Sequence, residues 1–131
     1  VFAVGIVNQR DIDRLNIYEA SQLAMRKALS RLPFTPDMLL VDGMRLKGVG
    51  TEQEKIVKGD LKVLSIAAAS VVAKVTRDRI MRRLHEVFPR YNFAKHKGYP
   101  TAEHVRLLKK YGVSYFHRRT FGPVARLISR G

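Results

Sequence analysis

The chain has 131 residues, of which 25 are Lys or Arg and 11 are Asp or Glu, so its formal net charge is +14. With 46% hydrophobic residues, it is too apolar for a disordered basic tail and long enough for a buried core, which predicts that residues 1–131 are one domain or part of one. The absence of Cys excludes a disulfide framework, a zinc–thiolate site and a cysteine nucleophile. No apolar run approaches the ~18 residues that a membrane span needs, so we expect no membrane as a partner.

The first half of the sequence predicts strands and a helix. Residues 1–7 are rich in β-branched side chains and predict a strand that opens partway, as in a segment cut at its amino end. Apolar residues at the helical period predict an amphipathic helix that begins near Asp11 and Asp13 and is closed by Pro33. Residues 38–41 are all apolar, which is typical of a strand buried on both faces of a mainly parallel sheet.

The second half predicts mostly helix. Residues 54–57 are a candidate strand, and residues 63–88 predict a long helix. Residues 89–100 predict a basic, aromatic loop, followed by a short helix over residues 101–111 and a last helix from Pro123. The order of strand, helix, strand, strand and long helix indicates an α/β layered fold.

The positive charge is concentrated in one part of the sequence. Residues 77–131 hold 14 Lys and Arg against 3 acids, whereas residues 1–76 hold 11 against 8. This charge allows two interpretations: a non-catalytic basic RNA-binding protein of the ribosomal-protein type, or a surface that binds phosphates beside an active site. Charge alone does not choose between them.

Two acidic residues lie where an α/β fold places chemistry. Asp42 follows the predicted strand, where ligands gather in open α/β sheets, although Asp-Gly is also a common turn dipeptide. Asp60 precedes the long helix, where an acid also stabilises the helix amino end. Because these are oxygen ligands and the chain has no Cys, the metal that the pair would hold is Mg²⁺ or Mn²⁺.

The predicted basic loop combines cations with an aromatic ring. His96 and Lys97 offer charge for phosphates, and Tyr99 offers a flat face for a sugar or a base. Tyr99 is equally compatible with a packing role.

The order of these motifs resembles that of bacterial ribonuclease HII over essentially the whole chain. The segments that carry the resemblance are VDG at 41–43, KGD at 58–60, SIAAAS at 65–70, HKGY at 96–99 and HRRTF at 117–121. Each is weak alone, but their shared order and spacing identify the family. Asp60 argues against the related ribonuclease HIII, in which the corresponding acid is usually Glu.

The resemblance implies a ribonuclease H-like α/β fold with a mixed central sheet flanked by helices. The implied activity is an endonuclease that hydrolyses the RNA strand of RNA–DNA hybrids and nicks 5′ of ribonucleotides embedded in duplex DNA, leaving 5′-phosphomonoesters. Such an enzyme removes misincorporated ribonucleotides during DNA replication and repair. We therefore expect a cytoplasmic monomer whose partners are RNA–DNA hybrids and DNA that contains ribonucleotides.

The resemblance also implies a site of four carboxylates that hold two divalent ions, Mn²⁺ or Mg²⁺. Asp42 and Asp60 match the third and fourth acids. The first two belong to an Asp-Glu-x-Gly-Arg-Gly segment, which we expect upstream of Val1; the domain would then be incomplete at its amino terminus and inactive alone. Tyr99 matches a tyrosine that packs against the deoxyribose after the ribonucleotide. Residues expected to bind phosphates or support the site are His96, Lys97 and Lys58.

Overall fold

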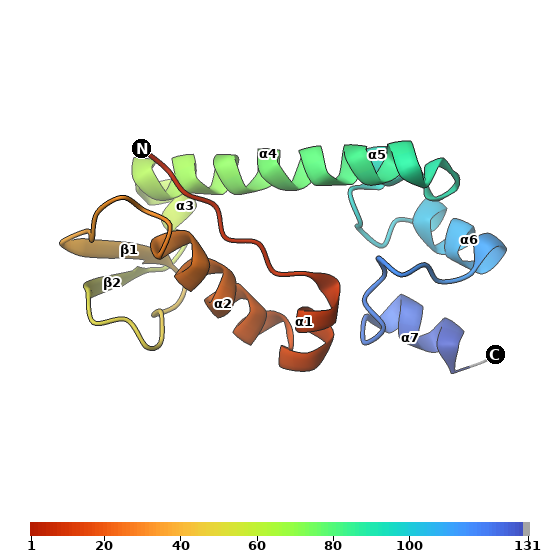
Figure 1. The fold of residues 1–131 in the computed structure, drawn as a ribbon, viewed down its shortest axis with the longest axis horizontal. Coiled ribbons are helices and arrows are strands. Elements are labelled where there is room, and N and C mark those ends of the chain that lie inside the picture. The colour runs from red at the N-terminus through yellow and green to blue at the C-terminus, as the bar shows by residue number, and fades with distance from the viewer. Residues whose placement is uncertain (130–131) are drawn as a thin grey trace. The chain divides into compact units, whose positions relative to one another are not determined.

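The computed structural model describes residues 1–129, which form helices and one two-stranded sheet (Figure 1). The chain divides into two compact units, the first spanning Val1–Lys74 and the second beginning at Val75. The boundary falls within the long helix α4 (Leu64–Val87). Each unit has its own buried apolar residues: Ala20, Val41, Leu46 and Ile66 in the first, and Tyr91, Phe93, Leu108 and Val124 in the second.

The first unit consists of two parallel strands and several helices. Its elements are α1 (Gln9–Leu15), α2 (Ile17–Leu29), β1 (Met38–Asp42), β2 (Glu52–Ile56), α3 (Gly59–Lys62) and the start of α4. In the parallel register, Val41 lies opposite Lys55 and Asp42 opposite Ile56. Val41 is buried, but Met38 and Leu40 on the other face of β1 are exposed. The expectation of burial on both faces is therefore wrong for the described residues, and Asp42 shares the exposed face.

Residues 1–8 do not form the predicted strand. Arg31 Nη1 donates to the carbonyl of Val4 at 2.6 Å, and Lys27 Nζ donates to that of Ile6 at 3.3 Å. These side chains bind carbonyls that a strand would offer to a neighbouring strand. A β-branched run becomes a strand only where another strand pairs with it, which is why composition misleads here.

The first predicted helix is in fact two helices. Asn16, with φ +73°, ends α1 and begins α2, and its side chain accepts a hydrogen bond from the amide of Glu19 at 3.1 Å. Asn8 caps α1 in the same way, through the amide of Asp11 at 3.0 Å. Asn tolerates positive φ and caps helices well, so a local polar residue overrides the apolar period.

The second unit is helical. The rest of α4 leads to the 3₁₀ helix η1 (Pro89–Tyr91), then α5 (Phe93–His96), α6 (Ala102–Tyr111) and α7 (Gly122–Ile128). The predicted long helix and the two helices after the basic loop are confirmed. Residues 89–100 are not wholly a loop, because η1 and α5 form there and are anchored by the buried rings of Tyr91 and Phe93.

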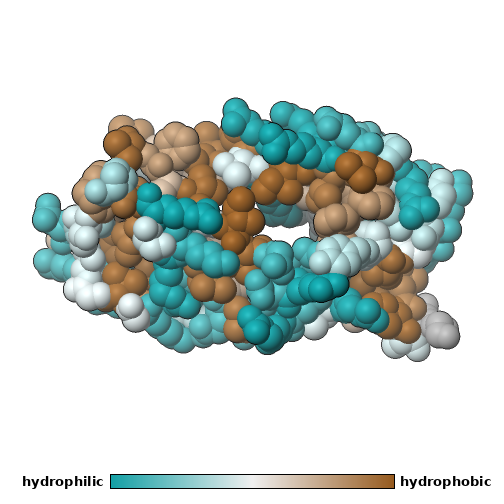
Figure 2. Space-filling view, viewed as in Figure 1, coloured by the Kyte–Doolittle hydropathy of each residue, from teal (hydrophilic) through white to brown (hydrophobic). Residues whose placement is uncertain are grey.

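Apolar and polar side chains gather on different parts of the surface (Figure 2). Figure 2 shows brown surface where Figure 1 places the amino terminus and the start of α4. Leu61 of α3 and Leu64 of α4 are 79% and 86% exposed. In the second unit, α4 exposes Arg79, Arg82 and Arg83. Among residues 1–129, none of the helices combines the length and hydropathy that crossing a membrane requires.

Candidate active site

One hydrogen bond joins the end of β1 to the start of α3. Oδ1 of Asp42 accepts from the amide of Gly59 at 2.9 Å, between residues 17 apart in the sequence. The parallel ladder continues beyond Asp42, since the amide of Gly43 donates to the carbonyl of Ile56 at 3.0 Å. Because Gly59 directly precedes Asp60, the structure brings the VDG and KGD segments together.

The position of Asp60 depends on close packing at Gly59. A Cβ atom on Gly59 would lie 2.6 Å from Cδ1 of the buried Ile66, so no larger residue fits without movement. Lys58, directly before Gly59, has φ +55°, and this left-handed backbone conformation turns the chain into α3. Asp60 lies in the first turn of α3, and both Lys58 and Asp60 are exposed.

Both acidic side chains are accessible. Apart from the Gly59 amide, no donor in the described part of the chain contacts the Asp42 carboxylate, and that of Asp60 has no hydrogen-bond or ion-pair partner there. Exposed carboxylate oxygens are the ligand type that Mg²⁺ and Mn²⁺ prefer. Within residues 1–129, no three His, Cys, Asp or Glu side chains form a group that could hold a metal ion. The donor chemistry fits a divalent ion, but two acids supply only half of the four carboxylates that the resemblance implies.

Two glutamines, both missed by the sequence analysis, shape the loop after β1. Gln22 is fully buried on α2; it donates to the carbonyl of Arg45 at 2.8 Å and accepts from the amide of Lys47 at 2.9 Å. Gln53 accepts from the amide of Leu46 at 2.7 Å and donates to its carbonyl at 2.9 Å. A carboxamide can bind a backbone N–H group and a backbone carbonyl at once, as a neighbouring strand would, because it carries both a donor and an acceptor. No sequence pattern reveals such a role, since the partners are backbone groups.

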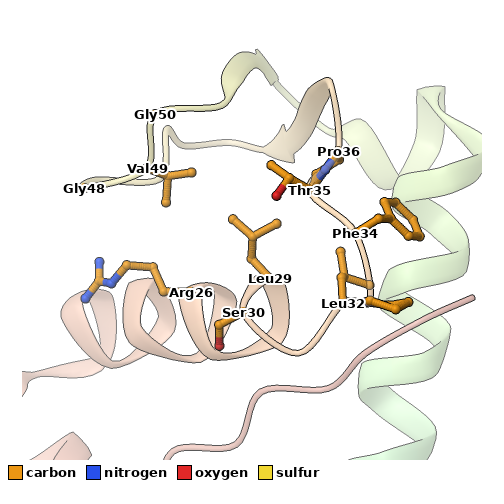
Figure 3. Close-up of a pocket in the computed structure, with 11 residues that line it drawn as sticks. Arg26, Leu29, Ser30, Leu32, Phe34, Thr35, Pro36, Gly48, Val49 and Gly50 are labelled. Carbon is orange, nitrogen blue, oxygen red and sulfur yellow. The ribbon is translucent and has the colours of Figure 1, made fainter.

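A pocket of about 550 Å³ lies elsewhere in the first unit (Figure 3). It lies between the end of α2, residues 32–36 and residues 48–50, and the side chains of Leu29 and Val49 point into it. Neither Asp42 nor Asp60 lines it, so it is separate from the candidate metal ligands.

In the second unit, Tyr99 lies on the surface with 58% of its area exposed. The guanidinium carbon of Arg77 lies 4.8 Å from the centroid of its ring, and Arg77 Nη2 donates to the carbonyl of Lys97 at 3.0 Å. Gly98 has φ +85°, and a Cβ atom there would lie 2.9 Å from Cε of Met81. The HKGY segment therefore needs glycine at this position, both for its backbone conformation and for space.

His96, predicted to bind phosphates or support the site, lies inside the unit. His96 is only 4% exposed, and both of its ring nitrogens have backbone partners. This geometry favours the supporting role. Lys97, with φ +51°, is half-buried next to it.

Two further histidines complete a buried group around His96. The rings of His96 and His104 stack with centroids 3.8 Å apart, and Nε2 of His104 lies 3.2 Å from Nε2 of His117. Burial lowers the pKa of His96, and burial together with the neighbouring His104 lowers the pKa of His117 to about 4. No signal in the sequence links the three, because they come from α5, α6 and the segment before α7.

Comparison with known proteins gives the family. Residues 2–124 match the family model described as Ribonuclease HII. A ribonuclease HII of Bacillus licheniformis is 56% identical over 121 residues, which are 92% of this chain and 47% of that protein. A ribonuclease HII of Enterococcus faecalis is 50% identical over 125 residues, 95% of this chain and 49% of that protein. The chain thus spans about half the length of these curated relatives.

A solved structure shows the same fold. The crystal structure of ribonuclease H2 from Pyrococcus horikoshii superposes with a TM-score of 0.72, covering 95% of this chain and 66% of that chain at 24% identity. The predicted ribonuclease H-like α/β fold is confirmed, with its sheet represented among residues 1–129 by one parallel pair. Since the family match extends over most of the sequence and the relatives align along it, the chain belongs to the ribonuclease HII family.

Proposed function

We propose that the protein carrying this chain is an endonuclease that hydrolyses the RNA strand of RNA–DNA hybrids and nicks duplex DNA 5′ of an embedded ribonucleotide, leaving 5′-phosphomonoesters. The observation that supports the proposal is the hydrogen bond from Gly59 to Asp42, which joins the VDG segment to the residue directly before Asp60. We further propose that this enzyme is monomeric and cytoplasmic and that it removes misincorporated ribonucleotides. Residues 1–131 would then be part of its one catalytic domain.

The proposed metal ligands are Asp42 and Asp60. Two divalent ions, Mn²⁺ or Mg²⁺, would supply activation of a water molecule and stabilisation of the leaving 3′ oxygen. The Gly59 amide orients Asp42 by binding Oδ1, and both carboxylates are exposed to a substrate. No adjacent Asp-Glu pair occurs in this sequence, so these acids are half of the proposed ligand set.

The proposed substrate contacts complement the acids. The exposed ring of Tyr99 would pack against the sugar after the ribonucleotide, where a missing 2′-hydroxyl distinguishes DNA from RNA. Lys58 and Lys97 would bind phosphates, with His96 supporting the segment from inside.

The alternative, a non-catalytic basic RNA-binding protein, has only the charge in its favour. Exposed Arg79, Arg82 and Arg83 suit either function. The exposed carboxylates of Asp42 and Asp60 repel phosphates unless a cation binds them, so they favour the enzyme.

The test is Asp42→Asn in the full-length protein, assayed by Mn²⁺-dependent nicking of duplex DNA with a single ribonucleotide. We expect the nicking rate to fall by more than about 100-fold, while binding to the hybrid stays nearly unchanged. Loss of a residue that only contacts a metal ligand costs about 10- to 100-fold, so a larger fall indicates that Asp42 is itself a ligand. The control Asp37→Asn removes the same charge from an exposed residue just before β1 and should nick normally. Normal nicking by Asp42→Asn would remove Asp42 from the site.

A further inference from the structure

His96, His104 and His117, here called the histidine cluster, are tied to the backbone that carries Tyr99. All three residues are buried, with 4%, 4% and 7% of their area exposed. Nδ1 of His104 lies 2.9 Å from the carbonyl oxygen of Tyr99, and the amide of Gly98 donates to Nδ1 of His96 at 3.0 Å. Two consecutive residues of the HKGY segment are therefore bound by ring nitrogens of the cluster.

The backbone partners determine which nitrogen of each ring carries its proton. In His96, Nδ1 accepts from Gly98, so Nε2 carries the proton and donates to the carbonyl of Tyr91 at 2.7 Å. In His117, Nδ1 accepts from the amide of Ser114 at 3.1 Å and lies 2.7 Å from the Ser114 hydroxyl, which can donate to it as well, so the proton is on Nε2. In His104, the Tyr99 carbonyl requires a proton on Nδ1, which leaves Nε2 to accept from His117.

No ring of the cluster can take a second proton without losing a hydrogen bond. The unprotonated nitrogens of His96 and His117 face the N–H groups of Gly98 and Ser114, and that of His104 faces the N–H of His117. A proton added at Nδ1 of His96 or Nε2 of His104 would place two donors against each other. One added at Nδ1 of His117 would lose the bond from the Ser114 amide and could donate only to the Ser114 hydroxyl, 2.7 Å away. Burial also disfavours the charged form, so the cluster is stable only when neutral.

The charged groups around the cluster do not reverse this preference. Glu103 on α6 is the acid that favours protonation of His96, but its carboxylate is bound by Lys95 of α5 at 2.7 Å and by Asn92 at 2.9 Å. His85 on α4 opposes protonation of His96. Arg90 of η1 is the nearby cation: its guanidinium carbon lies 5.2 Å from the ring centroid of Tyr91, and the Tyr91 ring in turn contacts His117. A cation at this place does not favour a charged imidazole.

We infer that His104 is a positioning residue for Tyr99 and that the neutral histidine cluster keeps the Tyr99 ring presented to the substrate, an inference that rests on the proposed function of Tyr99. The backbone of Tyr99 is bound on both sides: its amide donates to the carbonyl of His96 at 2.9 Å, and its carbonyl also accepts from the amide of Thr101 at 2.9 Å. The ring itself stays exposed. A second proton on Nδ1 of His96 would break its bond with the amide of Gly98, directly before Tyr99, so discrimination by Tyr99 falls on acidification.

Two substitutions of His104 in the full-length protein separate positioning from packing. Asn can place a donor near the position of Nδ1, whereas Gln reaches the position of Nε2, so His104→Asn retains the bond to Tyr99 and His104→Gln loses it. For a duplex with a single ribonucleotide, we expect His104→Gln to raise KM about tenfold with kcat within about twofold, and His104→Asn to recover most of the loss. In a Tyr99→Ala background, His104→Gln should add nothing. A tenfold effect that persists in that background would overturn the inference.

Nuclear magnetic resonance of the ring nitrogens tests the cluster without any activity measurement. At pH 7.5, the ¹⁵N spectra should show protons on Nε2 of His96 and His117 and on Nδ1 of His104, and no charged ring. As the pH falls from 6.5 to about 4, the amide resonances of Gly98 and Tyr99 should move as His96 and His117 take up protons. Other tautomers, or amides that do not respond, would refute the linkage. If the spectra are as expected but Tyr99→Ala nicks and discriminates normally, the proposed role of Tyr99 fails, whereas the positioning of its backbone stands.

Discussion

A Lys-Gly pair precedes the proposed functional residue in each unit, yet the two pairs use glycine for different reasons. Lys58 and Lys97 both adopt positive φ, +55° and +51°. Gly59 is needed because its neighbour Ile66 leaves no room for a Cβ atom, whereas Gly98 is needed mainly because its own φ is +85°. The same dipeptide thus serves steric fit before Asp60 and backbone conformation before Tyr99.

The proposed functional groups of the two units are also held differently. The carboxylate of Asp42 beside Asp60 is oriented by a single amide and stays exposed, as a metal ligand must. The backbone of Tyr99 is held by buried imidazoles. In both units, the side chains of Asp42, Asp60 and Tyr99 are exposed, whereas the residues that position them, Gly59 and the histidine cluster, are buried.

The largest expected effect is a loss of folding stability at acidic pH, caused by the buried His117 of the second unit. Because the pKa of His117 is lowered from 6.5 to about 4, this ring is neutral in the folded state and charged in the unfolded state between those values. Its contribution to stability is present above pH 6.5 and is lost as the pH falls from 6.5 toward 4. We expect a loss of roughly 2 kcal/mol, below the ~3 kcal/mol of the full shift because solvent screens the ring in part.

The measurement is the free energy of unfolding by urea at several pH values. His117→Gln, which cannot titrate, should flatten the dependence between pH 6.5 and pH 4 even if it lowers stability overall. An equally steep dependence in that variant would show that other groups cause it.

Gly59→Ala tests the steric requirement in the first unit. The new Cβ atom would lie 2.6 Å from Cδ1 of Ile66, and we expect a loss of about 2 kcal/mol from overpacking. Ile66→Val removes that Cδ1 atom, so the double variant should regain part of the loss. The measurement is the urea unfolding midpoint, and a double variant less stable than additivity predicts would contradict the steric explanation.

Gly98→Ala tests the conformational requirement in the second unit. We expect a loss of about 1 kcal/mol, because an L-residue with a Cβ atom is strained at φ +85°. Met81→Ala clears the side chain nearest to the new Cβ atom but should restore little, since the backbone strain remains. Thermal unfolding of the single and double variants measures this; full rescue by Met81→Ala would mean that space, not φ, requires the glycine.

The sequence predicts well those features that depend on neighbours along the chain. The long helix α4 and the strand β1 follow from local patterns of apolar residues, and their predicted and observed bounds differ by one residue at each end at most. The predicted strand over residues 1–7 and the single helix from Asp11 to Pro33 are wrong, because the first depends on a pairing strand and the second ignores the cap at Asn16. The α/β fold itself is confirmed, since the order of elements constrains it strongly.

By itself, the sequence determines the family, the α/β order of elements, and the candidate roles of Asp42, Asp60 and Tyr99 as proposals. Only the tertiary structure shows that Gly59 binds Asp42 and that three histidines from separate elements meet behind Tyr99. The physical reason is that motifs are read from residues adjacent in the chain. Hydrogen bonds between distant residues, and the burial that makes a histidine neutral, exist only after the chain has folded.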